Sequence, residues 1–112
     1  MDDIVIRPIG IIRTPFREPK GTPIQAGDNG AEGTVEVFPE YAEGLRDLDG
    51  FSHIMLLFSF HLASRTMLRV VPYVDTVERG VFSTRSPARP NHIGLSIVRL
   101  LSMEDTVLHV RD

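Results

Sequence analysis

The sequence of 112 residues contains no cysteine. This absence excludes disulfide bonds, thiolate zinc sites and a cysteine nucleophile, and it is typical of the reducing cytosol, so we expect a cytoplasmic location. Asp2 and Asp3 stand where a signal peptide would have its basic region, so no secretion signal is expected. The longest apolar run, residues 54–60, includes Ser59 and is far too short to cross a bilayer. We therefore expect no membrane partner.

Several familiar catalytic motifs are also missing. The chain has no glycine-rich dinucleotide fingerprint, no P-loop and no Gly-x-Ser-x-Gly elbow. His53 and His61 stand on one predicted strand, where eight residues separate them by about 26 Å, so they cannot share a metal ion. We expect no metal site and a function that depends on binding and positioning.

The chain has little helical patterning, and its strand patterns predict an all-β fold. Without the helices that parallel crossovers need, the sheet should be mostly antiparallel. We expect one domain over residues 1–112, a single-sheeted β-barrel with long loops and at most one short helix, at 39–50. The last strand is expected to have a free edge. The predicted strands span residues 4–13, 34–38, 51–61 (buried), 76–85, 93–101 and 106–110.

Charge is unevenly distributed along the chain. The net charge of -3 argues against general coating of nucleic acid. Residues 28–50 contain seven acids and one base, whereas residues 81–102 contain three arginines and no acid. This asymmetry indicates a local anion-binding wall, with an ordinary solvated surface as the alternative.

The basic region centres on the sequence RSPARPN, residues 85–91. Each proline fixes its own φ and biases the preceding residue toward an extended backbone. Arg85 and Arg89 are thus held on a stiff loop, and Asn91 suits a turn while offering both donor and acceptor. This pattern favours recognition of a polar ligand. A rigid turn that carries two incidental arginines is the alternative.

Two further segments are weaker candidates. Gln25, within the sequence GTPIQ, can hold polar groups of a ligand, although taken alone this segment favours a plain surface loop. His61 follows an apolar run and should lie at the barrel mouth, whereas His53 is expected to have a structural role.

Four segments resemble one family, the TsaA-like proteins or TrmO-type tRNA methyltransferases. They are PIGIIRTPF, GTPIQ, YAEGLRDLDGFSHIMLLFSFH and GVFSTRSPARPNHIGLSIVRLL, in the order found in the family. The resemblance implies a β-barrel that binds S-adenosylmethionine, works as a homodimer and methylates N6 of threonylcarbamoyladenosine beside the tRNA anticodon.

The resemblance also implies site residues. Arg89 and Asn91 are expected near the methyl acceptor or supporting the loop. The chemistry of methyl transfer, apart from the resemblance, leads us to nominate His61 to take the acceptor's proton. The expected cofactor contacts are Pro23, Ile24, Gln25, His61, Leu62, Arg85 and Leu95.

Three departures from the family pattern stand out. Ile24 replaces a common arginine, and His92 replaces a common proline, which should loosen the loop slightly. The sequence also stops where relatives continue into an Asp-Gly-Thr-Pro-type segment, which we expect to be absent here.

Two other functions fit the residues. The barrel can be a non-catalytic module that binds S-adenosylmethionine or a nucleotide, or it can transfer a methyl group to a small molecule. For a tRNA partner, Arg65, Arg69 and Arg79 are candidate backbone contacts, and simple solvated arginines are the alternative.

Overall fold

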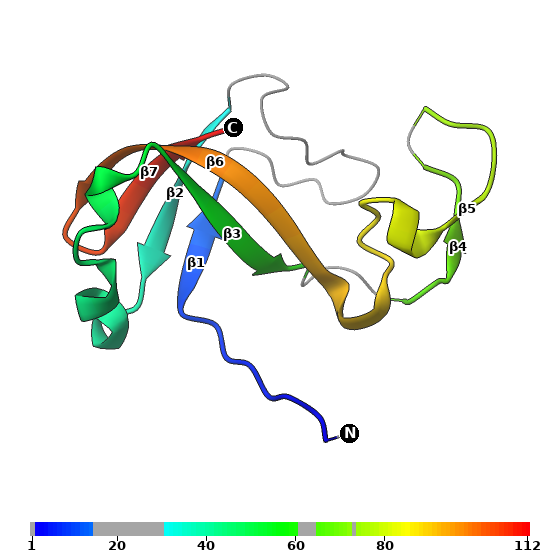
Figure 1. The fold of residues 1–112 in the computed structure, drawn as a ribbon, viewed down its shortest axis with the longest axis horizontal. Coiled ribbons are helices and arrows are strands. Elements are labelled where there is room, and N and C mark those ends of the chain that lie inside the picture. Colours follow the sequence, from blue (N-terminus) through cyan, green and yellow to red (C-terminus); the bar gives the residue numbers. More distant parts are fainter. Residues whose placement is uncertain (1, 15–30, 61–64, 73) are drawn as a thin grey trace.

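The computed structural model of the chain describes residues 2–14, 31–60, 65–72 and 74–112. Its main element is a five-stranded sheet of order β1-β2-β7-β6-β3, in which every neighbouring pair is antiparallel. The strands are β1 (Gly10–Arg13), β2 (Glu32–Val37), β3 (His53–Ser59), β6 (Ile93–Glu104) and β7 (Val107–Arg111). The sheet curls into an open half-barrel (Figure 1). The prediction of an all-β, mostly antiparallel fold is confirmed, with one main sheet that forms a half-barrel.

The sheet buries one face and exposes the other. Side chains alternate between the faces along each strand, and Val35, Val98 and Leu108 are among the core residues of the buried face, which we call the inner face. Leu45 and Leu48 pack against this core from the segment between β2 and β3. The opposite, outer face of β3 and β6 carries exposed side chains, among them Met55, Leu57 and Ile97.

Short 3-10 turns replace the predicted helix. Residues 39–50 form two of them, η1 (Pro39–Leu45) and η2 (Leu48–Gly50). Pro39 stands in the first turn as expected, because its fixed φ suits a helix start and its missing N–H is not needed there. Asp47 adopts a left-handed backbone, φ 67°, which separates the two turns. No helix of the described residues is long and apolar enough to cross a membrane.

A second, two-stranded sheet forms a ribbon from β4 (Arg69–Val70) and β5 (Arg79–Gly80). The ribbon stands away from the main sheet and leads through η3 (Val81–Ser83) and η4 (Pro90–His92) into β6 (Figure 1). The long strand predicted at 76–85 is therefore wrong, because only two of its residues have a strand partner.

Three other strand predictions need correction. The first strand starts at Gly10, because residues 4–9 are exposed and Pro8 removes a backbone donor. The strand predicted as buried, β3, is half exposed, with Met55 and Leu57 70% and 73% exposed. The last strand, β7, has no free edge among the described residues, since it pairs with both β2 and β6.

Candidate functional site

The arginine loop, residues 84–92, joins η3 to β6 and carries both predicted arginines. The Arg85 Nη2 donates a hydrogen bond to the carbonyl oxygen of Leu95 and lies 3.5 Å from the Oγ of buried Ser96. The Arg89 Nη1 and Nη2 donate to the carbonyl oxygens of Thr84 and Val81, at 2.9 and 3.3 Å. Because a guanidinium has five N–H donors, each arginine keeps donors for a ligand. The loop is thus stabilised by the groups that can also bind.

The backbone of this loop follows the proline pattern. Arg89, which precedes Pro90, is extended at φ -112° and ψ 158°, as predicted. Asn91 and His92 then adopt positive φ values of 67° and 50°. Asn tolerates this left-handed region, whereas a proline ring at position 92 would be incompatible with it. The loop therefore turns into β6 through two left-handed residues.

His92 connects three segments around the loop. Its Nδ1 lies 2.9 Å from the Pro87 carbonyl oxygen and its Nε2 lies 3.3 Å from Thr66 Oγ1. A carbonyl oxygen only accepts, so Nδ1 donates to it, and the Thr66 hydroxyl, which can donate or accept, pairs with Nε2. Its carbonyl oxygen accepts from the Phe60 N–H at 2.7 Å. The expectation that His92 loosens the loop is wrong, because these contacts tie it down.

Two aromatic side chains at the end of β3 pack over Gly94. Phe58 and Phe60 meet edge to face with ring centroids 5.1 Å apart, and Phe58 pairs in register with Gly94. A Cβ added to Gly94 would lie 2.7 Å from the Phe60 ring and 2.8 Å from the Phe58 ring. Only glycine leaves room for both rings at this position.

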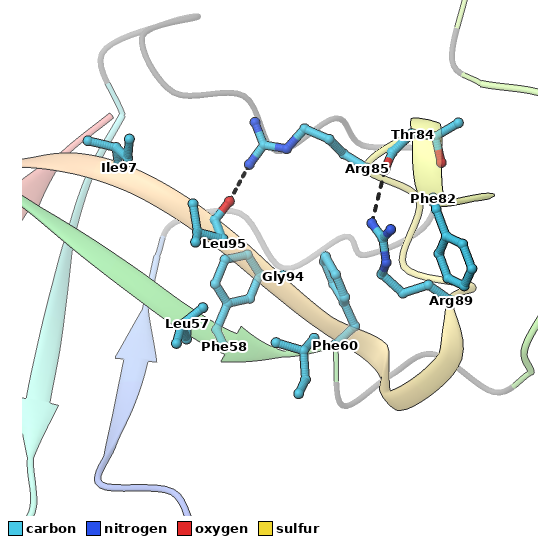
Figure 2. Close-up of a pocket in the computed structure, with 11 residues that line it drawn as sticks. Leu57, Phe58, Phe60, Phe82, Thr84, Arg85, Arg89, Gly94, Leu95 and Ile97 are labelled. Atoms are coloured by element: carbon cyan, nitrogen blue, oxygen red, sulfur yellow. Dashed lines mark hydrogen bonds between the residues drawn. The ribbon is translucent and has the colours of Figure 1, made fainter. Parts of the chain in front are cut away.

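The arginine loop and the aromatic pair enclose one pocket of about 480 Å³ (Figure 2). This volume is within the usual range for small-molecule sites. Exposed Phe82 stands on the loop side, beside Arg89, and the aromatic pair lies on the strand side. No acidic residue belongs to the described lining, which consists of Leu57, Phe58, Phe60, Phe82, Thr84, Arg85, Arg89, Ile93, Gly94, Leu95 and Ile97. The pocket suits an apolar, planar ligand with an anionic group.

The predicted site residues fall into three groups. Arg85, Arg89 and Leu95 line the pocket together. Asn91 does not line it and lies at the turn into β6. The third group lies outside the described residues and consists of Pro23, Ile24, Gln25, His61 and Leu62.

The aromatic wall of the pocket, formed by Phe58, Phe60 and Phe82, was not predicted from the sequence. Phe58 and Phe60 stood in an apolar run and were assigned to the strand core, and Phe82 was assigned to a strand. A glycine inside a predicted strand was the available signal, because it often marks a place where another group approaches closely. Among the described residues, no group of His, Asp and Glu could hold a metal ion.

The three arginines proposed to contact RNA differ in their surroundings. Arg69 lies 3.6 Å from Glu78, and Arg79 lies 3.2 Å from Asp75. Hydrogen bonds from the Val77 and Thr76 N–H groups, and then from Arg79, hold the pKa of Asp75 below its ordinary value. Both ribbon arginines therefore have acidic partners, whereas Arg65 has none among the described residues.

Fold and site together define a curled antiparallel β protein with an arginine-lined aromatic pocket at one end of its sheet. Residues 11–112 match the tRNA-methyltransferase O N-terminal domain, and the chain belongs to this family. It is 54% identical, over 97% of its length, to a probable S-adenosyl-L-methionine-binding protein of Pyrococcus abyssi. It is 36% identical, over 89% of its length, to the tRNA (adenine(37)-N6)-methyltransferase of Escherichia coli.

Solved structures agree with this assignment. A crystal structure of TrmO superimposes with a TM-score of 0.77 at 39% sequence identity and covers 98% of the chain. The chain spans 50% of that TrmO, 60% of the Pyrococcus relative and 46% of the Escherichia enzyme. The match therefore concerns one part of these longer proteins.

Proposed function

We propose that the chain is an S-adenosylmethionine-dependent methyltransferase that acts on N6 of threonylcarbamoyladenosine beside the tRNA anticodon. The observation that carries the proposal is the pocket that joins Arg85 and Arg89 to an aromatic wall. Both relatives' names support it, since one names the cofactor and the other the reaction and the RNA. A cytoplasmic location fits this function.

The pocket's residues fit the cofactor in size and chemistry. Phe58 and Phe60 offer an apolar wall for a purine ring, and Gly94 keeps that wall in place. Arg85 has spare N–H donors for a carboxylate. When bound, S-adenosylmethionine supplies a methyl group activated by a positive sulfonium. Pro23, Ile24, Gln25, His61, Leu62 and Leu95 remain proposed cofactor contacts.

The protein's own contribution is alignment and removal of a proton. Holding the acceptor in the reactive orientation can contribute roughly 7–11 kcal/mol in favourable cases. The acceptor nitrogen must lose its proton, and we propose His61 as the group that takes it. We propose that Arg89 pairs with the threonyl carboxylate and that Asn91 holds the turn behind it.

The test is transfer of labelled methyl from S-adenosylmethionine to tRNA. We expect label on tRNA that carries the threonylcarbamoyl group and none on the same tRNA without it. Cofactor binding with no transfer to either RNA would instead support a binding module, the function named for the Pyrococcus relative. Transfer that needs no RNA would support a small-molecule acceptor.

We also propose that the chain works as a homodimer. The β4–β5 ribbon supports this, because it stands away from the main sheet (Figure 1) and carries exposed Leu68 and Val74, 66% and 91% exposed. We propose that a second copy of the chain packs against these two side chains. Val74 also has a positive φ of 57°, so Val74→Asn should keep the backbone while weakening a dimer in sedimentation equilibrium. A wild-type chain that stays monomeric at every concentration would contradict this proposal.

A further inference from the structure

The described arginines fall into three classes by their partners. Four of them form ion pairs with acids, namely Arg13, Arg46, Arg69 and Arg79. Two, Arg85 and Arg89, donate to backbone carbonyls beside the pocket. The side chains of the remaining four, Arg7, Arg65, Arg99 and Arg111, form no hydrogen bond or ion pair with another described residue. Of these, Arg99 and Arg111 face each other.

Arg99 and Arg111 are directly opposite each other on β6 and β7. Both are exposed on the outer face. Opposite residues of an antiparallel pair have their Cα atoms about 4.5–5.5 Å apart. Like charges placed in this way destabilise a sheet unless something else neutralises them. The pair therefore destabilises the sheet, and a bound anion would relieve the repulsion between the two charges.

The neighbouring charges leave the pair positive. In the same row across the sheet, His53 lies opposite Arg99 and Glu32 lies opposite Arg111, with no ion pair between Glu32 and Arg111 among the described residues. Of the other acids of the outer face, Glu36 pairs with Arg13 at 2.7 Å, and Glu104 lies at the β6–β7 turn, 3.7 Å from the His109 Nε2. Glu32 thus offsets at most one of the two arginine charges.

The pair lies on the same face as part of the pocket's lining, whereas Phe58 and Gly94 belong to the inner face. Leu95, Ile97 and Arg99 alternate with buried residues of β6, so all three point to the outer face, and the first two line the pocket. Four residues of strand separate Arg99 from Leu95 by about 13 Å. A polynucleotide covers this distance with a few nucleotides. Between them, Met55 and Ile97 form an apolar surface on which a base or ribose can pack.

We propose that Arg99 and Arg111 bind the phosphate backbone of the RNA substrate a few nucleotides from the base that enters the pocket. The proposal rests on the proposed function, which supplies a polyanion as the substrate. A phosphodiester backbone suits two adjacent guanidinium groups, because each group can donate a forked pair of hydrogen bonds to one phosphate. The site fixes the position of the RNA along the outer face and carries no sequence information.

The test compares Arg99→Gln, Arg111→Gln and the double variant with Arg46→Gln as the matched control. Arg46 is exposed like the pair, but it belongs to the segment that covers the inner face. We expect each outer-face variant to lose roughly two- to fivefold in affinity for a modified anticodon stem-loop. The slope of log K against log salt should fall by about 1 for each arginine removed. Cofactor affinity and the Arg46→Gln affinity should stay at the wild-type values.

A stability measurement separates binding from structure. Because the substitutions relieve like-charge repulsion, the double variant should melt at the wild-type Tm or a few degrees above it. A lower Tm with a parallel loss of RNA affinity would overturn the proposal, since it would assign the pair a structural role.

Neutral backbone substitutions locate the contact. We would place methylphosphonates at successive positions of the stem-loop. Substitution at one or two positions near the modified base should abolish the difference in RNA affinity between the wild type and the double variant. Equal RNA affinity of the wild type and the double variant would overturn the proposal. The proposal would also be overturned if polyglutamate bound as tightly as RNA and if this binding depended on Arg99 and Arg111. If RNA binds as expected but receives no methyl group, the proposed function fails and the phosphate site stands.

Discussion

Replacing Gly94 with alanine tests how the pocket is built. The new methyl group would lie within 2.8 Å of both Phe58 and Phe60, much closer than a normal carbon–carbon contact. Overpacking of this kind costs about 1–3 kcal/mol, whereas alanine in place of a strand glycine gains about 0.5–1 kcal/mol. We therefore expect Gly94→Ala to lower the free energy of unfolding by about 1 kcal/mol.

The same substitution should also weaken binding of the ligand. The rings meet the methyl group with their far ends, so they can move, and the space they move into includes the pocket that they line. Losing the edge-to-face contact removes about 0.5–1.5 kcal/mol of the interaction that keeps the wall in place. We expect S-adenosylmethionine affinity to fall roughly two- to tenfold in isothermal titration calorimetry.

Gly80→Ala is the matched control. Gly80 is also a strand glycine, but a Cβ there meets no atom within 4 Å, and its φ of -63° suits any residue. This variant should unfold at the wild-type denaturant concentration or higher and bind the cofactor normally. If Gly94→Ala instead matches Gly80→Ala in both measurements, the reasoning about the aromatic wall is refuted.

Three further predictions concern the loop and the ribbon. Arg89→Lys keeps the charge but replaces the two guanidinium nitrogens that reach separate carbonyl oxygens with a single nitrogen. It should therefore raise the KM for tRNA and increase proteolysis of the loop, and an unchanged cleavage rate would contradict this. Thr66→Val removes one hydrogen bond from His92 and should cost about 0.5–1.5 kcal/mol in urea unfolding, whereas no cost should follow in a His92→Ala background. Because the pKa of Asp75 is lowered in the folded protein, its carboxylate stabilises the fold at pH values above its ordinary pKa of 3.8, and this stabilisation is lost as the pH falls through the folded-state pKa. Asp75→Asn should therefore flatten the dependence of Tm on pH below about pH 4. Parallel Tm profiles of the variant and the wild type would exclude this role.

Local patterns predicted the elements whose partners are close in the sequence. The β6–β7 hairpin follows from two alternating runs with a short turn, where Asp105 adopts a positive φ of 54°. The extended backbone at Arg89 follows from Pro90 alone. Such features need no knowledge of the rest of the chain, and the sequence was sufficient for them.

Contacts between distant segments were not predictable in this way. The central place of β7 depends on its pairing with β2, more than seventy residues earlier in the chain. The aromatic wall depends on the register that sets Phe58 opposite Gly94. His92 was expected to loosen the loop because its ring partners, Pro87 and Thr66, become visible only once three segments are in place.

The most direct test of the account is a crystal structure of the chain with S-adenosylmethionine added. The account predicts the cofactor in the pocket between the aromatic pair and the arginine loop, with a carboxylate oxygen within hydrogen-bond distance of Arg85. Arg99 and Arg111 should remain exposed on the outer face. A cofactor bound elsewhere, with Phe58, Phe60 and Arg85 making no contact to it, would contradict the account's central claim.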